Sequence, residues 1–303
     1  MLKFSDRSTG IICGAVAAAA YGLNPLFAKP LYAAGLSPAG LLFFRFALAS
    51  VMLLPLLKLK KLSLKITRSE TYASIMGGAL MVASSLCLYS SFNYMDVGLA
   101  MTLLFLYPII VAVIMGVFYR EKLSLATFAS ITLALLGLVS ITLLGKGKAD
   151  SAVNITWTGV ILSIGSAVSY ALYIVAVRKS SMQNMPCEKL TFYTVLFGSP
   201  MFLIFLKGGL MLTIPTQLDS WLYLFGVAFF PTIIALALMA VAIEKVGATP
   251  TAILGVLEPV TGLLIGLLMY GEKLTIFSAL GIVLIFLAVI LVIMGDKLSS
   301  RKS

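Results

Sequence analysis

Two charged residues, Arg45 and Glu258, lie deep inside apolar stretches of this 303-residue sequence. Each lies about ten residues into its stretch, so in a helix that crosses a membrane each is near the midplane, roughly 15 Å from the helix end. An intramembrane charge costs at least roughly 2.5–3.5 kcal/mol and should therefore face protein or water and have a partner. The two side chains could line a cavity for a zwitterionic substrate or take part in coupling. The alternative is a structural ion pair between the two halves of the chain.

Three small residues share a helical face with Glu258, namely Gly255, Gly262 and Gly266. Small residues allow membrane helices to approach closely. This face is therefore expected to pack against protein and not against lipid.

Aromatic and amide side chains near these charges could complete a binding site. Tyr21, Asn24 and Tyr170 are predicted to line the same central space, which would suit amino acids or aromatic metabolites. For Tyr89, Asn93 and Tyr107 the residue types favour interhelical packing or a position at the membrane interface. Tyrosines and serines in the same spans, Ser169 and Tyr173 among them, leave both interpretations open.

Prolines interrupt three of the apolar stretches, at Pro25, Pro108 and Pro259. Each proline removes a backbone donor and leaves a carbonyl of the preceding turn without its partner. Kinks or local unwinding are therefore expected beside the predicted cavity. Simple kinks that serve packing are the alternative, because proline is frequent in transmembrane helices.

The composition requires these residues to be held by membrane helices. The chain is 61% hydrophobic and 11% charged, with a mean hydropathy of +1.09, whereas soluble domains are about 45–50% apolar and about 25% charged. Apolar runs of about twenty residues match a helix that crosses the bilayer. Ten such runs are predicted, at 10–31, 36–57, 72–92, 97–118, 124–144, 157–177, 190–206, 220–243, 249–270 and 275–295.

Basic residues predict the orientation of these spans. With the N-terminus inside, 16 of the 22 lysines and arginines fall on the cytoplasmic side, five on the other side, and Arg45 within a span. Such an excess marks the cytoplasmic loops of membrane proteins. Both termini are therefore predicted to be cytoplasmic. The formal charge of +11 is explained by this bias, and nucleic acid binding is not expected.

The sequence also repeats itself. Residues 10–30 resemble residues 159–179 at a shift of 149, which pairs Tyr21 with Tyr170. Pro108 pairs with Pro259 at a shift of 151. We predict an all-α membrane protein of two five-helix repeats, residues 1–148 and 149–303. Because five is odd, the second repeat enters the membrane from the opposite side, and such inverted repeats hold a substrate site between them in transporters.

Several segments resemble the EamA-type family of the drug/metabolite transporter superfamily. They are FFRFALA at 43–49, NYMDVGLA at 93–100, LYP at 106–108, REKLS at 120–124 and LEPVTGLLIGLLMYGEKL at 257–274. The resemblance implies ten helices, cytoplasmic termini, a place in a bacterial inner (plasma) membrane, and export or exchange of small metabolites such as amino acids. Neighbouring branches carry nucleotide sugars, phosphorylated sugars or drugs. Span 1 lacks the acidic residue of small four-helix relatives, so their coupling scheme does not carry over, and the coupling ion, a proton or another, stays open.

Other functional classes lack their signatures. There is no histidine, which removes the usual metal ligand and the usual base of an intramembrane protease. No Walker A motif, no metalloprotease motif and no buried aspartate pair is present, and Cys13, Cys87 and Cys187 are expected to be buried thiols. We therefore expect a non-enzymatic protein without cofactor or metal, whose partners are a small-molecule substrate and lipid. A channel or a non-transporting scaffold is the alternative class.

Overall fold

The computed structural model describes residues 6–91, 93–95, 97–121, 124–141, 156–269 and 275–299, and these form helices and no strands. The first part of the chain forms α1 (Asp6–Gly22), α2 (Asn24–Ala33), α3 (Pro38–Leu59), α4 (Arg68–Ser91), α5 (Val97–Leu104), α6 (Tyr107–Tyr119) and α7 (Leu125–Val139). The rest forms α8 (Trp157–Lys179), α9 (Cys187–Gly198), α10 (Phe202–Phe205), α11 (Leu218–Ala228), α12 (Ala235–Val246), α13 (Ala248–Leu254), α14 (Leu257–Met269) and α15 (Ile276–Ser299). A π-helical turn, Phe229–Ile234, joins α11 to α12.

Seven helical segments of the described chain are long and apolar enough to cross a membrane, judged by length and composition. They are Asp6–Ala33, Pro38–Leu59, Arg68–Ser91, Ala100–Tyr119, Trp157–Lys179, Leu218–Val246 and Ala248–Met269. Two shorter apolar helices, Leu125–Val139 and Ile276–Leu291, fall on two more of the predicted spans. The remaining predicted span, 190–206, falls on α9 and α10 with a 3-10 turn between them. The total of ten therefore stays a prediction.

Three of the long segments are each broken into two helices. The breaks lie at Leu23, between α1 and α2, at 105–106, between α5 and α6, and at 255–256, between α13 and α14. Each break comes two to four residues before Pro25, Pro108 or Pro259. A proline has no N–H to donate and its ring clashes with the preceding turn, which explains why the helix is interrupted at that place.

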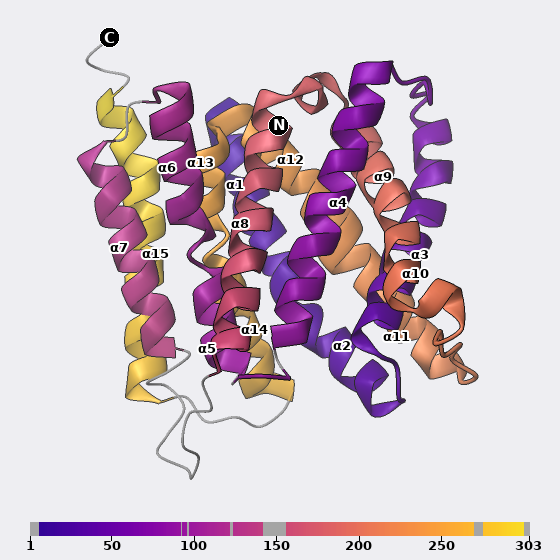
Figure 1. Cartoon of the computed structure of the whole chain (residues 1–303). Helices are drawn as coiled ribbons and strands as arrows, with labels where there is room; N and C mark the ends of the chain where they lie inside the picture. The colour runs from indigo at the N-terminus through magenta and orange to yellow at the C-terminus, as the bar shows by residue number, and fades with distance from the viewer. Residues whose placement is uncertain are drawn as a thin grey trace.

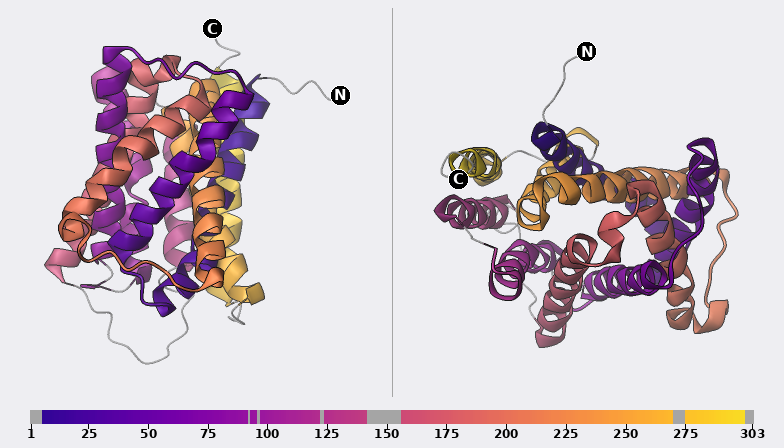
Figure 2. Two further views of the ribbon diagram at one scale, coloured as in Figure 1. Left: turned by 90° about the vertical axis from the view of Figure 1, so that its right-hand side faces the viewer. Right: turned by 90° about the horizontal axis from the view of Figure 1, so that it is seen from above.

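The most extensive contacts join helices that are far apart in the sequence. α4 packs along α8, α1 along α12, and α7 along α15, while α3 contacts both α9 and α11. The pair of α7 and α15 lies at one side of the bundle, on the left in Figure 1 and in the right-hand view of Figure 2. The start of α1 and the end of α15 lie at the same end of the helices.

The interior and the surface are both apolar. The largest buried side chains include Phe46, Phe105, Tyr173 and Phe202. Large apolar side chains also cover the outside, where Phe118, Trp157, Ile161, Leu268 and Ile276 are more than two-thirds exposed. An exposed apolar surface of this extent requires a partner other than water, and lipid is the partner that fits helices of this length.

Three of the family-like segments extend beyond the described residues. Asp96 of the segment 93–100, residues 122–123 of the segment 120–124, and residues 270–274 of the segment 257–274 lie outside them.

Candidate functional site

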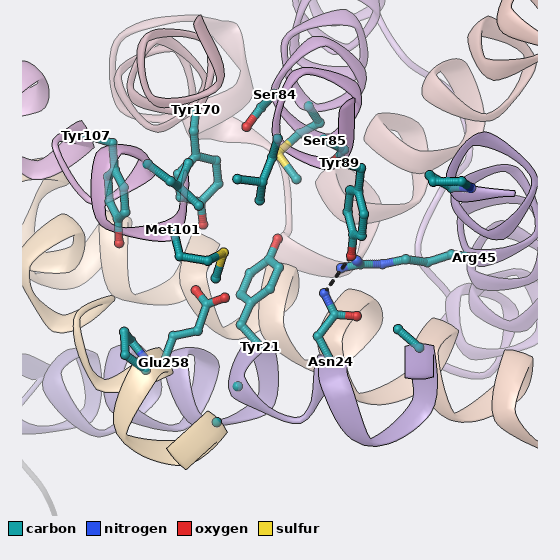
Figure 3. Close-up of a pocket in the computed structure, with 18 of the residues that line it drawn as sticks. Tyr21, Asn24, Arg45, Ser84, Ser85, Tyr89, Met101, Tyr107, Tyr170 and Glu258 are labelled. Carbon is teal, nitrogen blue, oxygen red and sulfur yellow. Dashed lines mark hydrogen bonds between the residues drawn. The ribbon is translucent and has the colours of Figure 1, made fainter. Parts of the chain in front are cut away.

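A cavity of about 580 Å³ lies among α1, α2, α3, α4, α5, α6, α8 and α14. Binding pockets for small molecules span about 300–1,000 Å³ and are mostly apolar with a few polar groups, and this cavity fits both criteria. Its wall consists of Tyr21, Gly22, Asn24, Ala28, Lys29, Tyr32, Pro38, Arg45, Met81, Ser84, Ser85, Leu88, Tyr89, Asn93, Met101, Leu104, Tyr107, Tyr170, Glu258, Pro259 and Gly262. Figure 3 shows the polar members of this wall.

The cavity reaches the surface at the end of the bundle away from the termini. Exposed Lys29 and Asn93 belong to its wall. Helices α2, α5 and α14, which contribute to the wall, lie at that end in Figure 1. The exposed residues of the cavity wall therefore lie at the end of the bundle opposite the termini.

The structure brings all five predicted site residues together. The wall contains Tyr21, Asn24, Arg45, Tyr170 and Glu258, which come from five different helices. Tyr89, Asn93 and Tyr107, for which packing was favoured, line the same cavity. Of the three prolines, Pro259 lines the cavity, Pro108 is buried against a separate small gap beside Phe105, and the side chain of Pro25 lies outside the described residues.

Arg45 is fixed by the π-helical turn. Its Nε–H donates to the Thr232 hydroxyl oxygen at 2.6 Å, and its Nη2 donates to the Pro231 carbonyl at 2.6 Å. The guanidinium carbon also lies 5.8 Å from the centre of the Tyr21 ring. The side chain is 4% exposed, so these contacts replace the water that a buried arginine loses.

Glu258 starts α14 and faces the opposite part of the cavity. In Figure 3 its carboxylate points toward Tyr21 and Met101, while Arg45 enters from the far side. The ion pairs found among the described residues link Lys60 with Glu188 and Lys245 with Asp6, and none joins Arg45 to Glu258. The two charges therefore stand as separate groups in one cavity and do not form the structural ion pair.

A close helix contact holds Glu258 in place. A Cβ atom on Gly22 would lie 2.6 Å from the carbonyl oxygen of Glu258 and 2.4 Å from Cβ of Thr261. The break after α1 and the start of α14 therefore touch backbone to backbone. A Cβ atom on Gly262, which belongs to the predicted small-residue face, would lie 3.9 Å from the carbonyl oxygen of Gly22, so this face is turned toward protein, as the glycine spacing predicts.

Tyrosine rings form one wall of the site. The rings of Tyr107 and Tyr170 meet edge to face at 4.8 Å, and Tyr170 stacks with Tyr173 at 6.5 Å. The Tyr170 hydroxyl lies 3.2 Å from the sulfur of Met239. Aromatic pairs of this geometry add about 0.5–1.5 kcal/mol to the effect of burial. Tyr107 and Tyr170 therefore form an apolar face of the cavity that a ring or a branched alkyl group of a ligand could contact, and buried Tyr173 packs against Tyr170 outside the wall.

Polar atoms at the cavity are only partly satisfied by protein partners. Asn24 donates from Nδ2 to the Tyr89 hydroxyl at 3.1 Å. Among the described residues, buried atoms without a hydrogen bond include the Tyr21 hydroxyl, Asn24 Oδ1 and the Tyr32 hydroxyl. The Tyr21 hydroxyl lies beside Tyr170 and the Tyr32 hydroxyl beside Tyr89, whereas no interaction is found for Asn24 Oδ1 in the described part of the chain. Buried polar atoms in proteins are nearly always satisfied, so Asn24 Oδ1 is the atom that water or a ligand donor could reach.

Sequence reasoning missed part of this wall. The missed residues of the wall are Gly22, Ala28, Lys29, Tyr32, Pro38, Met81, Ser84, Ser85, Leu88, Met101 and Leu104, and Pro231 and Thr232, which hold Arg45, were missed as well. Ser84 and Ser166 share a hydrogen bond of 3.1 Å between α4 and α8. A polar residue within an apolar run was a usable signal for the serines, whereas Met101 and Leu104 resemble any lipid-facing residue.

The end of the bundle near the termini is closed by polar contacts. Glu188 pairs with Lys60, the Lys189 ammonium donates to the Lys65 carbonyl at 2.5 Å, and the Tyr193 hydroxyl donates to the Leu64 carbonyl. These contacts tie the start of α9 to the loop between α3 and α4. Lys245 bonds Asp6 at 2.7 Å, and this hydrogen bond and charge hold the pKa of Asp6 below its ordinary value.

The described residues contain no cluster of three or more histidine, cysteine, aspartate or glutamate side chains that could hold a metal ion. The wall of the cavity carries two basic side chains, Lys29 and Arg45, one carboxyl group, Glu258, and several hydroxyl, amide and aromatic groups.

Comparisons with known proteins agree with this geometry. A solved protein whose title reads only "Crystal structure of protein" has the same fold, with a TM-score of 0.80 over 94% of this chain and 98% of that one, at 16% identity. An "Uncharacterized transporter" of Archaeoglobus fulgidus is 27% identical over 65% of this chain and 67% of its own length. "Uncharacterized transporter YetK" of Bacillus subtilis is 25% identical over 84% of this chain and 77% of its own.

The model of the EamA-like transporter family matches the chain twice, at residues 8–143 and 157–294. Those two matches cover most of the described helices and all of the helices that line the cavity. This chain is a multi-pass membrane protein that belongs to the EamA-like transporter family.

Proposed function

We propose that this protein is a secondary transporter that exports or exchanges amino acids or related small metabolites, with alternating access to the central cavity. The observation that carries the proposal is the placement of Arg45 and Glu258 as separate charges in one cavity of about 580 Å³. An α-amino acid has a carboxylate that could bind Arg45 and an ammonium group that could bind Glu258. The rings of Tyr107 and Tyr170, which line the cavity, offer a face for its side chain.

The helix contacts support two inverted repeats, with a boundary near 148. In such an arrangement α1–α2 corresponds to α8, α4 to α11–α12, and α7 to α15. The contact of α4 with α8 then corresponds to that of α1 with α12, and both are among the most extensive in the protein. The contact of α7 with α15 is its own counterpart. We infer ten spans on this basis. The distribution of lysines and arginines supports cytoplasmic termini, and the family match and the Bacillus relative support a bacterial inner membrane.

With the termini inside, the cavity faces outward. The contacts of α9 with the loop between α3 and α4 then form the closed cytoplasmic side. Alternating access requires that these contacts break while the mouth near α2 and α5 closes. The helix breaks at Leu23, 105–106 and 255–256 lie beside the cavity and provide backbone positions at which the half-helices can turn.

The test is efflux of radiolabelled amino acids from cells that express wild type, Glu258→Gln or Glu244→Gln at matched membrane levels. Glu244 is exposed and lies outside the cavity, so its variant is the control. We expect wild type and Glu244→Gln to export the same class of amino acid and Glu258→Gln to lose at least about tenfold in rate, since tenfold corresponds to about 1.4 kcal/mol of binding. Equal export by all three would remove Glu258 from the site.

A panel that includes sugar phosphates, nucleotide sugars and cationic drugs completes the test. Export of one of these and of no amino acid would overturn the substrate class while leaving the transporter assignment in place. Loss of both charges without any effect on transport would identify them as structural.

A further inference from the structure

The π-helical turn Phe229–Ile234 does more than join α11 to α12, because it determines which atoms of Arg45 are left for a ligand. In a regular helix, the carbonyl of Val227 would accept from the N–H of residue 231. Residue 231 is proline and has no N–H. The Thr232 hydroxyl donates to the Val227 carbonyl in its place, at 2.9 Å.

That bond fixes the direction of the Thr232 hydroxyl. A hydroxyl group has one proton to donate and two lone pairs that accept. Because the proton is used on Val227, the oxygen faces Arg45 only as an acceptor, and it accepts from Nε at 2.6 Å. Thr232 is fully buried, so no water competes for this position.

Both contacts of Arg45 with the turn use the same edge of the guanidinium. Nε donates to Thr232 and Nη2 to the Pro231 carbonyl, which are the two nitrogens of the edge next to the side-chain stem. The edge formed by Nη1 and the second hydrogen of Nη2 has no hydrogen-bond partner among the described residues. Two parallel N–H groups on such an edge match the two oxygens of a carboxylate or phosphate.

We propose that Arg45, held by the π-helical turn, is the oxyanion subsite of the cavity, and that Thr232 is the residue that positions it. The subsite takes a carboxylate or a phosphate group of the substrate. This inference rests on the proposed function for its location, since Arg45 belongs to the wall of the same cavity. It adds that the substrate must carry a planar or tetrahedral oxyanion. It also adds that Thr232, which lies outside the cavity wall, controls the affinity for that group.

The experiment measures binding to purified protein in lipid nanodiscs by calorimetry, with L-phenylalanine and its carboxamide, L-phenylalaninamide, as the two probes. The variants are Thr232→Val, Thr232→Ser and Thr251→Val. Thr251 is the matched control, because it is also buried and its hydroxyl donates to its own helix, to the Gly247 carbonyl at 2.7 Å. Thr232→Ala replaces Thr232→Val if the latter is not recovered as a monodisperse protein.

We expect Thr232→Val to weaken binding of L-phenylalanine about tenfold, the size of effect that a hydrogen bond to a charged group supports. Thr232→Ser and Thr251→Val are expected to bind it as wild type does. L-phenylalaninamide lacks the oxyanion, so its affinity is expected to stay equal in all four proteins. A purely structural role of Thr232 would weaken both probes together.

Three outcomes overturn the inference: Thr232→Val binds L-phenylalanine as wild type does, both probes weaken equally, or serine fails to restore binding. If wild type binds neither probe, the comparison is repeated with lactate and inorganic phosphate, which share only the oxyanion. If Thr232→Val binds either anion more weakly than wild type does, the oxyanion subsite is supported and amino acids are rejected as the substrate class. If wild type and Thr232→Val bind lactate and phosphate equally, or bind neither, the subsite is rejected.

Discussion

Gly137 of α7 and Gly281 of α15 touch backbone to backbone. A Cβ atom on Gly281 would stand 2.5 Å from the Gly137 carbonyl oxygen, and one on Gly137 would stand 2.7 Å from the Gly281 carbonyl oxygen. One turn away, the Ser140 hydroxyl donates to the Phe277 carbonyl at 2.6 Å. In lipid, helices associate through close packing and interhelical hydrogen bonds, so this crossing holds α7 and α15 together.

Gly281→Ala should destabilise the protein even though alanine favours helices. The added methyl group meets a backbone oxygen that cannot move aside, and overpacking of this kind costs about 1–3 kcal/mol. We expect a lower unfolding temperature of the nanodisc-embedded protein. The control is Gly165→Ala, where the new methyl group would meet only the sulfur of Cys87, at 3.8 Å. A Gly281→Ala protein as stable as that control would contradict the close crossing.

Tyr89→Phe should weaken substrate binding without slowing transport at saturation. The Tyr89 hydroxyl accepts from Asn24 Nδ2 at 3.1 Å and so keeps Asn24 Oδ1 directed for a ligand donor. A neutral hydrogen bond contributes about 0.5–1.5 kcal/mol, which predicts a rise of roughly two- to tenfold in KM. The control is Tyr72→Phe, because Tyr72 is exposed and outside the cavity. An unchanged KM in a transport assay would show that Asn24 is oriented by other contacts.

Cys187 is a natural probe for opening of the side near the termini. Burial raises the pKa of the Cys187 thiol to about 12, so its reaction with a maleimide at neutral pH should be slow. Tyr193→Phe removes the hydroxyl that donates to the Leu64 carbonyl and should increase the labelling rate several-fold. The measurement uses a Cys13→Ser and Cys87→Ser background, with Tyr72→Phe as the matched variant. Identical rates in both variants would mean that this contact does not hold the side closed.

Acid should weaken the start of α4. The Thr67 amide donates to Glu70 Oε2 at 2.7 Å, and the Glu70 amide donates to the Thr67 hydroxyl oxygen at 3.2 Å. The backbone hydrogen bond from Thr67 holds the pKa of Glu70 below its ordinary value of 4.5. A carboxylate with a lowered folded pKa stabilises the fold above pH 4.5, and this contribution is lost as the pH falls through the lowered value.

The expected effect at pH 7 is below about 1 kcal/mol, because the carboxylate is largely exposed and screened by solvent. The difference in unfolding temperature between wild type and Glu70→Gln should therefore shrink as the pH falls from about 5 to about 3, because a glutamate with a lowered pKa titrates in roughly this range. Glu244→Gln, which alters an exposed carboxylate elsewhere, should show a difference that does not follow this range. A constant difference for Glu70→Gln would rule out the capping contribution.

Depth and repeat symmetry were enough to select from the sequence five residues that line the central cavity, and their role in binding stays a prediction. Arg45 and Glu258 stood out because charges are expensive within apolar runs, and the pairing of Tyr21 with Tyr170 indicated a shared central space. Thr232 could not be found in this way. Threonine is common in membrane helices, and its role depends on a π-helical turn whose only local signal is Pro231.

Some helices, too, could be predicted from the sequence and others could not. Long spans such as Pro38–Leu59 and Trp157–Lys179 were predicted within a few residues, because twenty apolar residues in a row have few alternatives in lipid. The predicted span 190–206 is instead the short pair α9 and α10, divided by Ser199–Met201. Pro200 and the polar residues Thr191 and Thr194 shorten the apolar run there. Whether such a segment forms one long helix or two short ones depends on its tertiary contacts.

The contacts of α1 with α12, α4 with α8 and α7 with α15 also govern how the chain can be assembled during synthesis. The glycines of α1 touch the late part of the chain: a Cβ on Gly10 would meet Val246, and one on Gly14 would meet Leu254. α1 therefore leaves the ribosome long before the surface that it packs against exists. A chain that stops before α12 would have α8 to pack against α4, but it would leave α1 and α7 without their principal neighbours, α12 and α15.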